Sequence, residues 1–200
     1  MKYTLTITIL SLTLLLGCTE KKHKTSDDAL TPAQKEEVNY IAKGLEYVVN
    51  TQALLAGNLM SAIQEKGTVE AIEFCNIEAI PLTDSLVKDI EMTIKRVSDQ
   101  PRNPNNRANE DELAYIQKGK EALKNDQNIM PFLKEHDEKM TVYYPIFTHG
   151  LCMQCHGSTT DAIQPEVLAK LNQLYPDDEA TGYSENELRG IWVVEMNKEH

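Results

Sequence analysis

A long amphipathic pattern between Thr31 and Gly67 restricts the folds open to this chain. Thr31 can cap a helix, and Pro32 suits the first helical position. Apolar residues then recur at steps of three and four, interrupted only near Gln52, at Val38, Ile41, Leu45, Val48, Leu55, Leu59 and Ile63. This spacing predicts one helix of about nine turns. We expect Gly67 to end the helix and the folded domain to begin near Thr31.

A second helix is predicted directly after that glycine, with Thr68 as its cap and residues 69–79 as its body. Its apolar stripe consists of Ala71, Ile72, Cys75 and Ala79. Cys75 is therefore expected on the inward face. Pro81 should disturb the helix soon afterwards, because proline removes a backbone donor.

The later half of the chain alternates strand-like and helical segments. Strands are expected at 90–98, twice within 130–148 with a turn near residues 136–138, and at 188–196; helices are expected from Asn109 to about Lys124 and at 165–175. The last strand should be central, because its apolar run is dense. The strands fall late and lack regular crossover helices. This order predicts an α+β fold with an antiparallel sheet rather than a doubly wound one.

Composition limits the function classes. A chain of 200 residues suggests one domain, and an apolar fraction of 41% is enough for a core. The formal charge is −11, and no basic cluster stands out in the body of the chain. A nucleic-acid binder needs a basic face to displace counterions, so nucleic acid is not an expected partner.

The first residues resemble an export signal. Residues 1–17 carry one lysine, an apolar run and a glycine directly before Cys18. This is typical of a bacterial lipoprotein, in which Cys18 is acylated and holds the protein to a membrane. The alternatives are an ordinary signal peptide with a stray cysteine, or a short anchor. Residues 18–30 are polar and predicted to be a flexible tether, and residues 31–200 form the domain. The expected location is periplasm-facing or at the cell surface.

The stretch THGLCMQCHG contains Cys152, Cys155 and His156 in C-x-x-C-H spacing. This spacing is typical of covalent haem attachment, in which both thiols form thioethers and the histidine binds iron. The rivals are a disulfide, a redox dithiol, or half of a zinc site that recruits Cys75 and His149. Export fits haem c, and we expect one covalently attached haem.

A low-spin haem needs a ligand opposite His156, usually Met or His. The candidates are His136, His149, Met130, Met140, Met196 and Cys75. Methionines more often fill cores than bind iron. Cys75 is also an unpaired cysteine in an exported chain, although periodicity alone favours a small buried hydrophobe there.

Four motifs in order, AIEFCNIEA, IKRVSDQPRNPNN, YYPI…CMQCHG and YPDDEATGYSENELRGIWVV, cover roughly residues 35–196. Together they resemble a family of PAS-like monohaem c-type cytochromes, described from a cyanobacterial haem protein and found also as sensor domains of histidine kinases. The resemblance implies a PAS-like antiparallel sheet with a long N-terminal helix and flanking helices. It further implies thioethers at Cys152 and Cys155, His156 as the proximal ligand and Cys75 as the distal ligand.

Two further residues are expected near the haem. Arg96 lies in a predicted strand and suits a haem propionate, because guanidinium groups form paired hydrogen bonds with carboxylates. Tyr144, just before the attachment motif, can pack on the ring, although one of the adjacent tyrosines is as readily a core residue. The acids of YPDDEATGYSENE are expected to form a solvated loop.

Three functions are open at this stage. A redox or gas sensor is favoured by the PAS-like resemblance and the unusual cysteine ligand, with a small diatomic ligand as its partner. An electron-transfer cytochrome with a redox partner protein is the alternative. A peroxidase-like enzyme is less favoured, because a filled sixth position leaves no site for substrate. A thiolate ligand stabilises ferric iron, so a low midpoint potential is expected.

Overall fold

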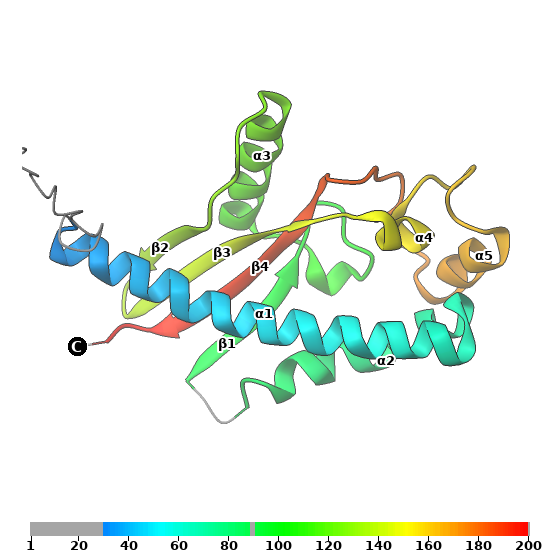
Figure 1. The fold of residues 1–200 in the computed structure, drawn as a ribbon, viewed down its shortest axis with the longest axis horizontal. Coiled ribbons are helices and arrows are strands. Elements are labelled where there is room, and N and C mark those ends of the chain that lie inside the picture. Colours follow the sequence, from blue (N-terminus) through cyan, green and yellow to red (C-terminus); the bar gives the residue numbers. More distant parts are fainter. Residues whose placement is uncertain (1–29, 89–90, 200) are drawn as a thin grey trace, which may run out of the picture.

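The computed structural model describes residues 30–88 and 91–199 of the chain. The predicted signal peptide, Cys18 and nearly all of the tether lie outside the described residues. In the described part, helices surround a single antiparallel sheet (Figure 1). No helix within these two ranges is long and apolar enough to cross a bilayer.

The sheet has four strands in the order β1-β4-β3-β2, and every neighbouring pair is antiparallel. The strands are β1 (Met92–Val97), β2 (Phe132–His136), β3 (Lys139–Phe147) and β4 (Leu188–Asn197). The last strand lies between β1 and β3, as its dense apolar run predicted. The α+β prediction with an antiparallel sheet is therefore confirmed, and the arrangement fits the expected PAS-like fold.

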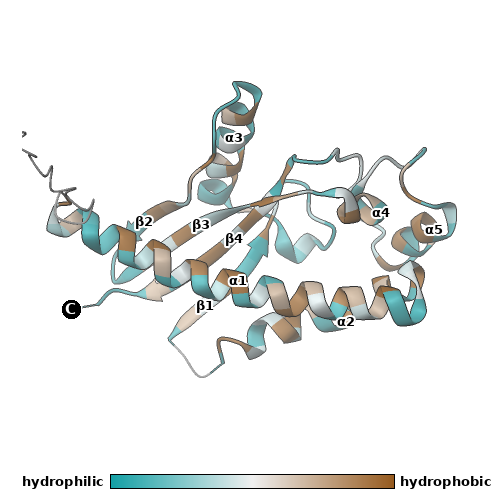
Figure 2. Cartoon of the chain, viewed as in Figure 1, coloured by the Kyte–Doolittle hydropathy of each residue, from teal (hydrophilic) through white to brown (hydrophobic). Residues whose placement is uncertain are grey.

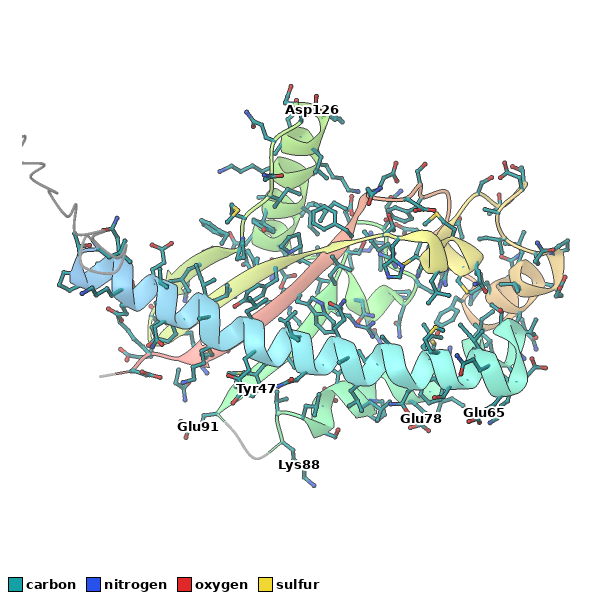
Figure 3. All side chains as sticks on the ribbon, viewed as in Figure 1. Tyr47, Glu65, Glu78, Lys88, Glu91 and Asp126 are labelled. Carbon is teal, nitrogen blue, oxygen red and sulfur yellow. The ribbon has the colours of Figure 1, made fainter. Side chains whose placement is uncertain are left out.

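The N-terminal helix α1 (Pro32–Lys66) begins and ends where the sequence predicted. Thr31 and Gln34 form a capping box, and Gly67 follows the last turn with a positive φ of 91°. The helix crosses one face of the sheet and continues beyond it, alongside α2 (Figure 1). Glu65 near its end and Glu78 on α2 point outward (Figure 3).

The helix α2 (Thr68–Ser85) differs from its prediction at both ends. Thr68 is its first residue rather than its cap, and the Thr68 hydroxyl donates to Oε1 of Gln154 at 3.0 Å. Pro81 lies inside the helix. The proline removes the donor that would reach the carbonyl of Ile77, and a proline ring inside a helix crowds the same carbonyl. Packing against α1 therefore outweighs the local cost.

The remaining helices are α3 (Glu110–Lys124), α4 (Met153–His156), α5 (Pro165–Leu174) and the single 3₁₀ turns η2 (Pro104–Asn106) and η3 (Gly150–Cys152). Of these, α3 packs on the face of the sheet opposite α1, and α4 and α5 pack together beside α2. Asn109 caps α3, as predicted, and the structure adds a capping box with Glu112. The helix α5 packs on α2. The C-x-x-C-H motif follows soon after β3 and lies near the junction of α1 and α2, where Thr68 donates to Gln154 (Figure 1).

The sheet buries apolar side chains on both faces, and brown strands run between partly teal helices in Figure 2. One cluster packs toward α1 and includes Tyr40, Val48, Ile94, Val142, Tyr144, Trp192, Val194 and Met196. The other packs toward α3 and includes Val97, Ile116, Tyr143, Leu188, Ile191 and Val193. Alternate residues of β4 therefore belong to different clusters, which explains why this strand is apolar at every position from Ile191 to Val194.

Candidate functional site

A cavity of about 390 Å³ lies between α2, the end of β1 and the attachment motif. We call it the site cavity; its lining includes Cys75, Arg96, Arg102, Cys152, Cys155, His156, Tyr175 and Arg189. The volume falls within the range of about 300–1,000 Å³ that is usual for cofactor pockets. Most of the lining surface is apolar, with a few polar groups among it. Such a composition suits a large, mainly apolar ligand with localised charge.

The attachment motif forms a 3₁₀ turn followed by one α-helical turn. Tertiary contacts hold its end in place: the backbone amide of Tyr183 donates to the carbonyl of His156 at 2.9 Å, and that of Gly182 donates to Gly157 at 2.8 Å. A Cβ at Gly157 would lie 2.7 Å from the carbonyl of Met153, so the turn needs glycine there. The thiols of Cys152 and Cys155 are free and partly exposed. Both thiols line the cavity and can therefore react with a ligand bound there.

The His156 ring is oriented by its backbone partner. Nδ1 lies 2.7 Å from the carbonyl oxygen of Ala180, a residue that is fully buried. Since a carbonyl can only accept, Nδ1 carries the proton and Nε2 keeps its lone pair. Burial, and then the charges of Arg102 and Arg189, hold the pKa of His156 well below its usual value. The imidazole is therefore neutral with one free nitrogen, which is the state a metal ligand requires.

Cys75 lies on α2 and lines the same cavity as the motif. Its side chain is half-buried, as the helical periodicity predicted. Burial raises the pKa of the thiol, while the positive charges of Arg96 and Arg102 oppose that rise. The thiol thus faces a cationic region that would favour its thiolate once a metal replaced the proton.

Three arginines reach the cavity, and they differ in their partners. Nε of Arg102 donates to Asp178 at 2.9 Å, and Nη1 of Arg189 donates to the Ser98 hydroxyl at 2.9 Å. Arg96 lies over the ring of Trp192, 5.3 Å from its centroid. Within residues 30–88 and 91–199, no carboxylate lies within ion-pair distance of Arg96.

Burial lowers the pKa of the Arg96 guanidinium, because desolvation disfavours the charged form. A nearby anion would offset that penalty. Arg96 can thus receive a carboxylate from a ligand, and so can Arg189, which also lines the cavity and has no carboxylate within ion-pair distance among the described residues. The sequence placed Arg96 near the expected haem, and the structure brings it together with Cys75 and the motif.

Tyr144 does not line the site cavity. Its side chain is 2% exposed and lies in the core between α1 and the sheet, where its hydroxyl donates to the carbonyl of Ile41 at 2.7 Å. A Cβ at Gly44 would come within 2.3 Å of that hydroxyl, so glycine permits the close approach. Of the two readings that the sequence left open for this residue, the structure supports the core position.

The other candidates for the distal ligand lie mostly elsewhere. Met140 and Met196 are buried in the core, and Met130 is 71% exposed beside α3. His136 lies on the exposed hairpin between β2 and β3 beside Asp137. His149 is exposed and lines the cavity. Cys75 and His149 are therefore the two candidates that the structure leaves at the cavity.

Sequence reasoning missed the environment of Asp178, which was expected to be solvated. Its side chain is 7% exposed and paired with Arg102. The two charged residues are 76 positions apart, so no local pattern could reveal the pair. The presence of Arg189 at the cavity was also missed. Its position in a dense apolar strand was a signal, because a charged residue in a buried strand is expected to have a specific partner. Tyr175 lies under Arg102, 5.9 Å from the ring centroid to the guanidinium carbon.

The zinc alternative lacks a compact ligand set. No group of three or more His, Cys, Asp or Glu side chains in the described ranges is arranged to hold a metal ion. Cys75, Cys152, Cys155 and His156 therefore line one space without converging on one point. A ligand that joins them must be extended.

The fold and the cavity define an α+β domain in which the C-x-x-C-H motif and a distant cysteine, Cys75, line one pocket. The family model described as Tll0287-like matches residues 20–197, and the chain belongs to the Tll0287-like family. The crystal structure of the cyanobacterial heme-protein Tll0287 is similar in fold, with a TM-score of 0.60 and 17% sequence identity over 86% of this chain and 99% of that chain. No curated protein matches this sequence.

Proposed function

We propose that this protein is an extracytoplasmic, lipid-anchored c-type monohaem protein. One observation carries the proposal: free Cys152 and Cys155 and a neutral His156 with its Nε2 available line the same cavity as Cys75. Membership of a family named after a protein described as a heme-protein supports the cofactor. Haem is extended and mostly apolar, which matches a cavity whose donors do not converge.

The residues fit the group in three places. Cys152 and Cys155 would hold the haem through thioether bonds, and His156 would bind the iron through Nε2. Arg96 would pair with a propionate, because its cation lacks a carboxylate partner among the described residues. The haem supplies reversible one-electron chemistry of iron, and the protein supplies the ligands and the electrostatic surroundings.

Cys75 is the proposed second axial ligand. It lines the cavity from α2, an element separate from the motif, and the neighbouring Arg96 and Arg102 favour a thiolate there. A thiolate donates charge to iron and stabilises the ferric state, so we expect a midpoint potential well below zero. The proposed role is redox or gas sensing, in which Cys75 would supply a ligand that a small diatomic molecule would displace from the reduced iron.

Electron transfer is the alternative role. His149 and Gln154 are exposed and line the cavity, so one edge of a bound haem would be open to a redox partner. The two roles separate on one measurement. Loss of the thiolate signature on adding carbon monoxide or nitric oxide to reduced protein supports sensing, whereas an unchanged spectrum with rapid reduction by a cytochrome supports electron transfer.

The proposed cofactor is tested by isolating the full-length protein after expression with a haem c maturation system. We expect a pyridine haemochrome spectrum of haem c and haem that stays with the denatured chain. Protein that carries no haem under these conditions would refute the proposal.

The distal ligand is tested with Cys75→Ala. We expect covalent haem to remain, the ferric spectrum to change its spin state or sixth ligand, and the midpoint potential to rise, because a strong electron donor is lost. Ile77→Ala is the matched control, since Ile77 is exposed on the same helix and outside the cavity lining. A Cys75→Ala spectrum identical to that of the wild type would exclude Cys75 as a ligand.

The position of Tyr144 gives a separate test. Tyr144→Phe removes the hydrogen bond to Ile41 and should lower the free energy of unfolding by about 1 kcal/mol. The haem spectrum should stay the same, because Tyr144 lies outside the cavity lining. Denaturant titration and a visible spectrum of the same sample measure both quantities. A shifted haem spectrum with an unchanged free energy of unfolding would contradict the placement of Tyr144 in the core.

A further inference from the structure

Arg102 and Asp178 form an ion pair that hydrogen-bonds the backbone of Ala180, the residue whose carbonyl oxygen accepts from His156 Nδ1. Nε of Arg102 donates to Oδ2 of Asp178 at 2.9 Å, and Oδ1 of the same carboxylate accepts from the backbone amide of Ala180 at 2.7 Å. Nη2 of Arg102 donates to the carbonyl of Ala180 at 3.3 Å and also to the carbonyl of Cys155. The pair therefore contacts both the amide and the carbonyl oxygen of Ala180.

The carbonyl of Ala180 is shared between two donors. His156 Nδ1 lies 2.7 Å from this oxygen, and Arg102 approaches the same oxygen from its own side. The stronger the acceptor, the more electron density an imidazole gives to a metal at its other nitrogen. A cationic donor on the same oxygen weakens that acceptor. Arg102 would thus reduce the electron density that His156 donates to a metal at Nε2.

The pair is held away from solvent. The side chain of Arg102 is 14% exposed, that of Asp178 is 7% exposed, and Ala180 is fully buried. Charges in such a place are screened less than surface charges, so each acts strongly on its neighbours. With both residues present, the carboxylate offsets the guanidinium. The charges of Arg189 and Arg96 also act on His156, so the carboxylate offsets only part of the positive charge there.

We propose that Arg102 and Asp178 are positioning residues that set the reduction potential of the haem bound at His156, acting through the carbonyl of Ala180. This inference rests on the proposed function, because it needs iron at His156. Arg102 favours the reduced state through its charge and its hold on the carbonyl. Asp178 opposes Arg102 by neutralising that charge. The two halves of one ion pair therefore act on the potential with opposite signs.

The test is spectroelectrochemical titration of the full-length haem-bearing protein and its variants. Arg102→Gln should lower the midpoint potential and Asp178→Asn should raise it. Each variant should change the equilibrium constant for reduction about tenfold, which corresponds to about 59 mV for a one-electron couple. Arg102→Lys keeps the charge and should shift the potential less than Arg102→Gln. Should Arg102→Gln fail to fold, Asp178→Asn and Arg102→Lys still decide the result.

A neighbouring pair supplies the control. Arg107 and Glu179 join the same two segments of chain, but their side chains are 51% and 47% exposed. Arg107→Gln and Glu179→Gln should each change the equilibrium constant less than twofold, because solvent screens exposed charges. If the Arg102–Asp178 pair only fixed the loop, Arg102→Gln and Asp178→Asn would both lower the melting temperature. They would not shift the midpoint potential in opposite directions.

The outcomes separate the two levels of the proposal. Shifts of opposite sign at Arg102 and Asp178, with small shifts in the exposed pair, support the inference. Equal, absent or same-sign shifts in protein that carries covalent haem overturn the inference and leave the proposed function standing. A chain without haem refutes the proposed function and this inference with it.

Discussion

Replacing both Cys152 and Cys155 by serine is expected to abolish covalent haem. The two thiols lie in the turn that forms the cavity wall, and serine hydroxyls do not form thioethers with haem vinyl groups. Denatured double-variant protein should therefore lose all chain-bound haem in a pyridine haemochrome assay or a haem-stained gel. Each single variant should keep a reduced amount, held by one remaining thioether.

Cys75→Ser is the matched control for this result. It removes a thiol of the same cavity that the proposal assigns to iron coordination rather than to attachment. The Cys75→Ser protein should keep its full content of chain-bound haem while its spectrum changes. Loss of covalent haem in Cys75→Ser, or its retention in the double variant, would contradict the assignment of the three cysteines.

Gly190→Ala is expected to be the most destabilising single methyl added to the fold. A Cβ at Gly190 would lie 2.4 Å from the carbonyl oxygen of Val97, which belongs to the backbone of β1 and cannot swing aside. Overpacking of this kind costs about 3 kcal/mol. For a domain of this size the melting temperature should fall by about 6–12 °C. Thermal unfolding followed by far-ultraviolet circular dichroism measures the change.

Gly57→Ala provides the opposite case with the same substitution. Gly57 lies inside α1, and a Cβ there would meet no atom within 4 Å. Alanine is more favourable than glycine in a helix interior by about 0.8–1.0 kcal/mol, so Gly57→Ala should raise the melting temperature. The steric explanation for Gly190 would be wrong if both variants changed stability by the same amount and sign.

Local patterns predicted most of the elements. Residues 31–67 formed the expected helix because an N-cap, a proline and a three-four apolar repeat all act within a few residues of one another. The strand at 188–196 was placed in the centre of the sheet because a dense apolar run is typical of a strand buried on both faces. The end of α2 was missed, since tolerance of Pro81 depends on packing against α1 rather than on local sequence.

The site was predictable only in part. C-x-x-C-H identified Cys152, Cys155 and His156, because that chemistry depends on residues next to one another. The assignment of Cys75 as a ligand came from family resemblance, since helical spacing alone favoured a small buried hydrophobe at that position. The surroundings of His156 could not be predicted, because Ala180 and Arg102 reach it from segments 24 and more positions away.

The sequence by itself determined the α+β class, the long first helix and the motif with which we propose that the chain binds its cofactor. These features depend on interactions between neighbouring residues. Tertiary structure alone decided that Cys75 shares a cavity with the motif, that Tyr144 belongs to the core, and that Asp178 is buried with Arg102. Those outcomes depend on which surfaces pack together when the chain folds. Contacts between residues far apart in sequence produce no local sequence pattern from which they could be predicted.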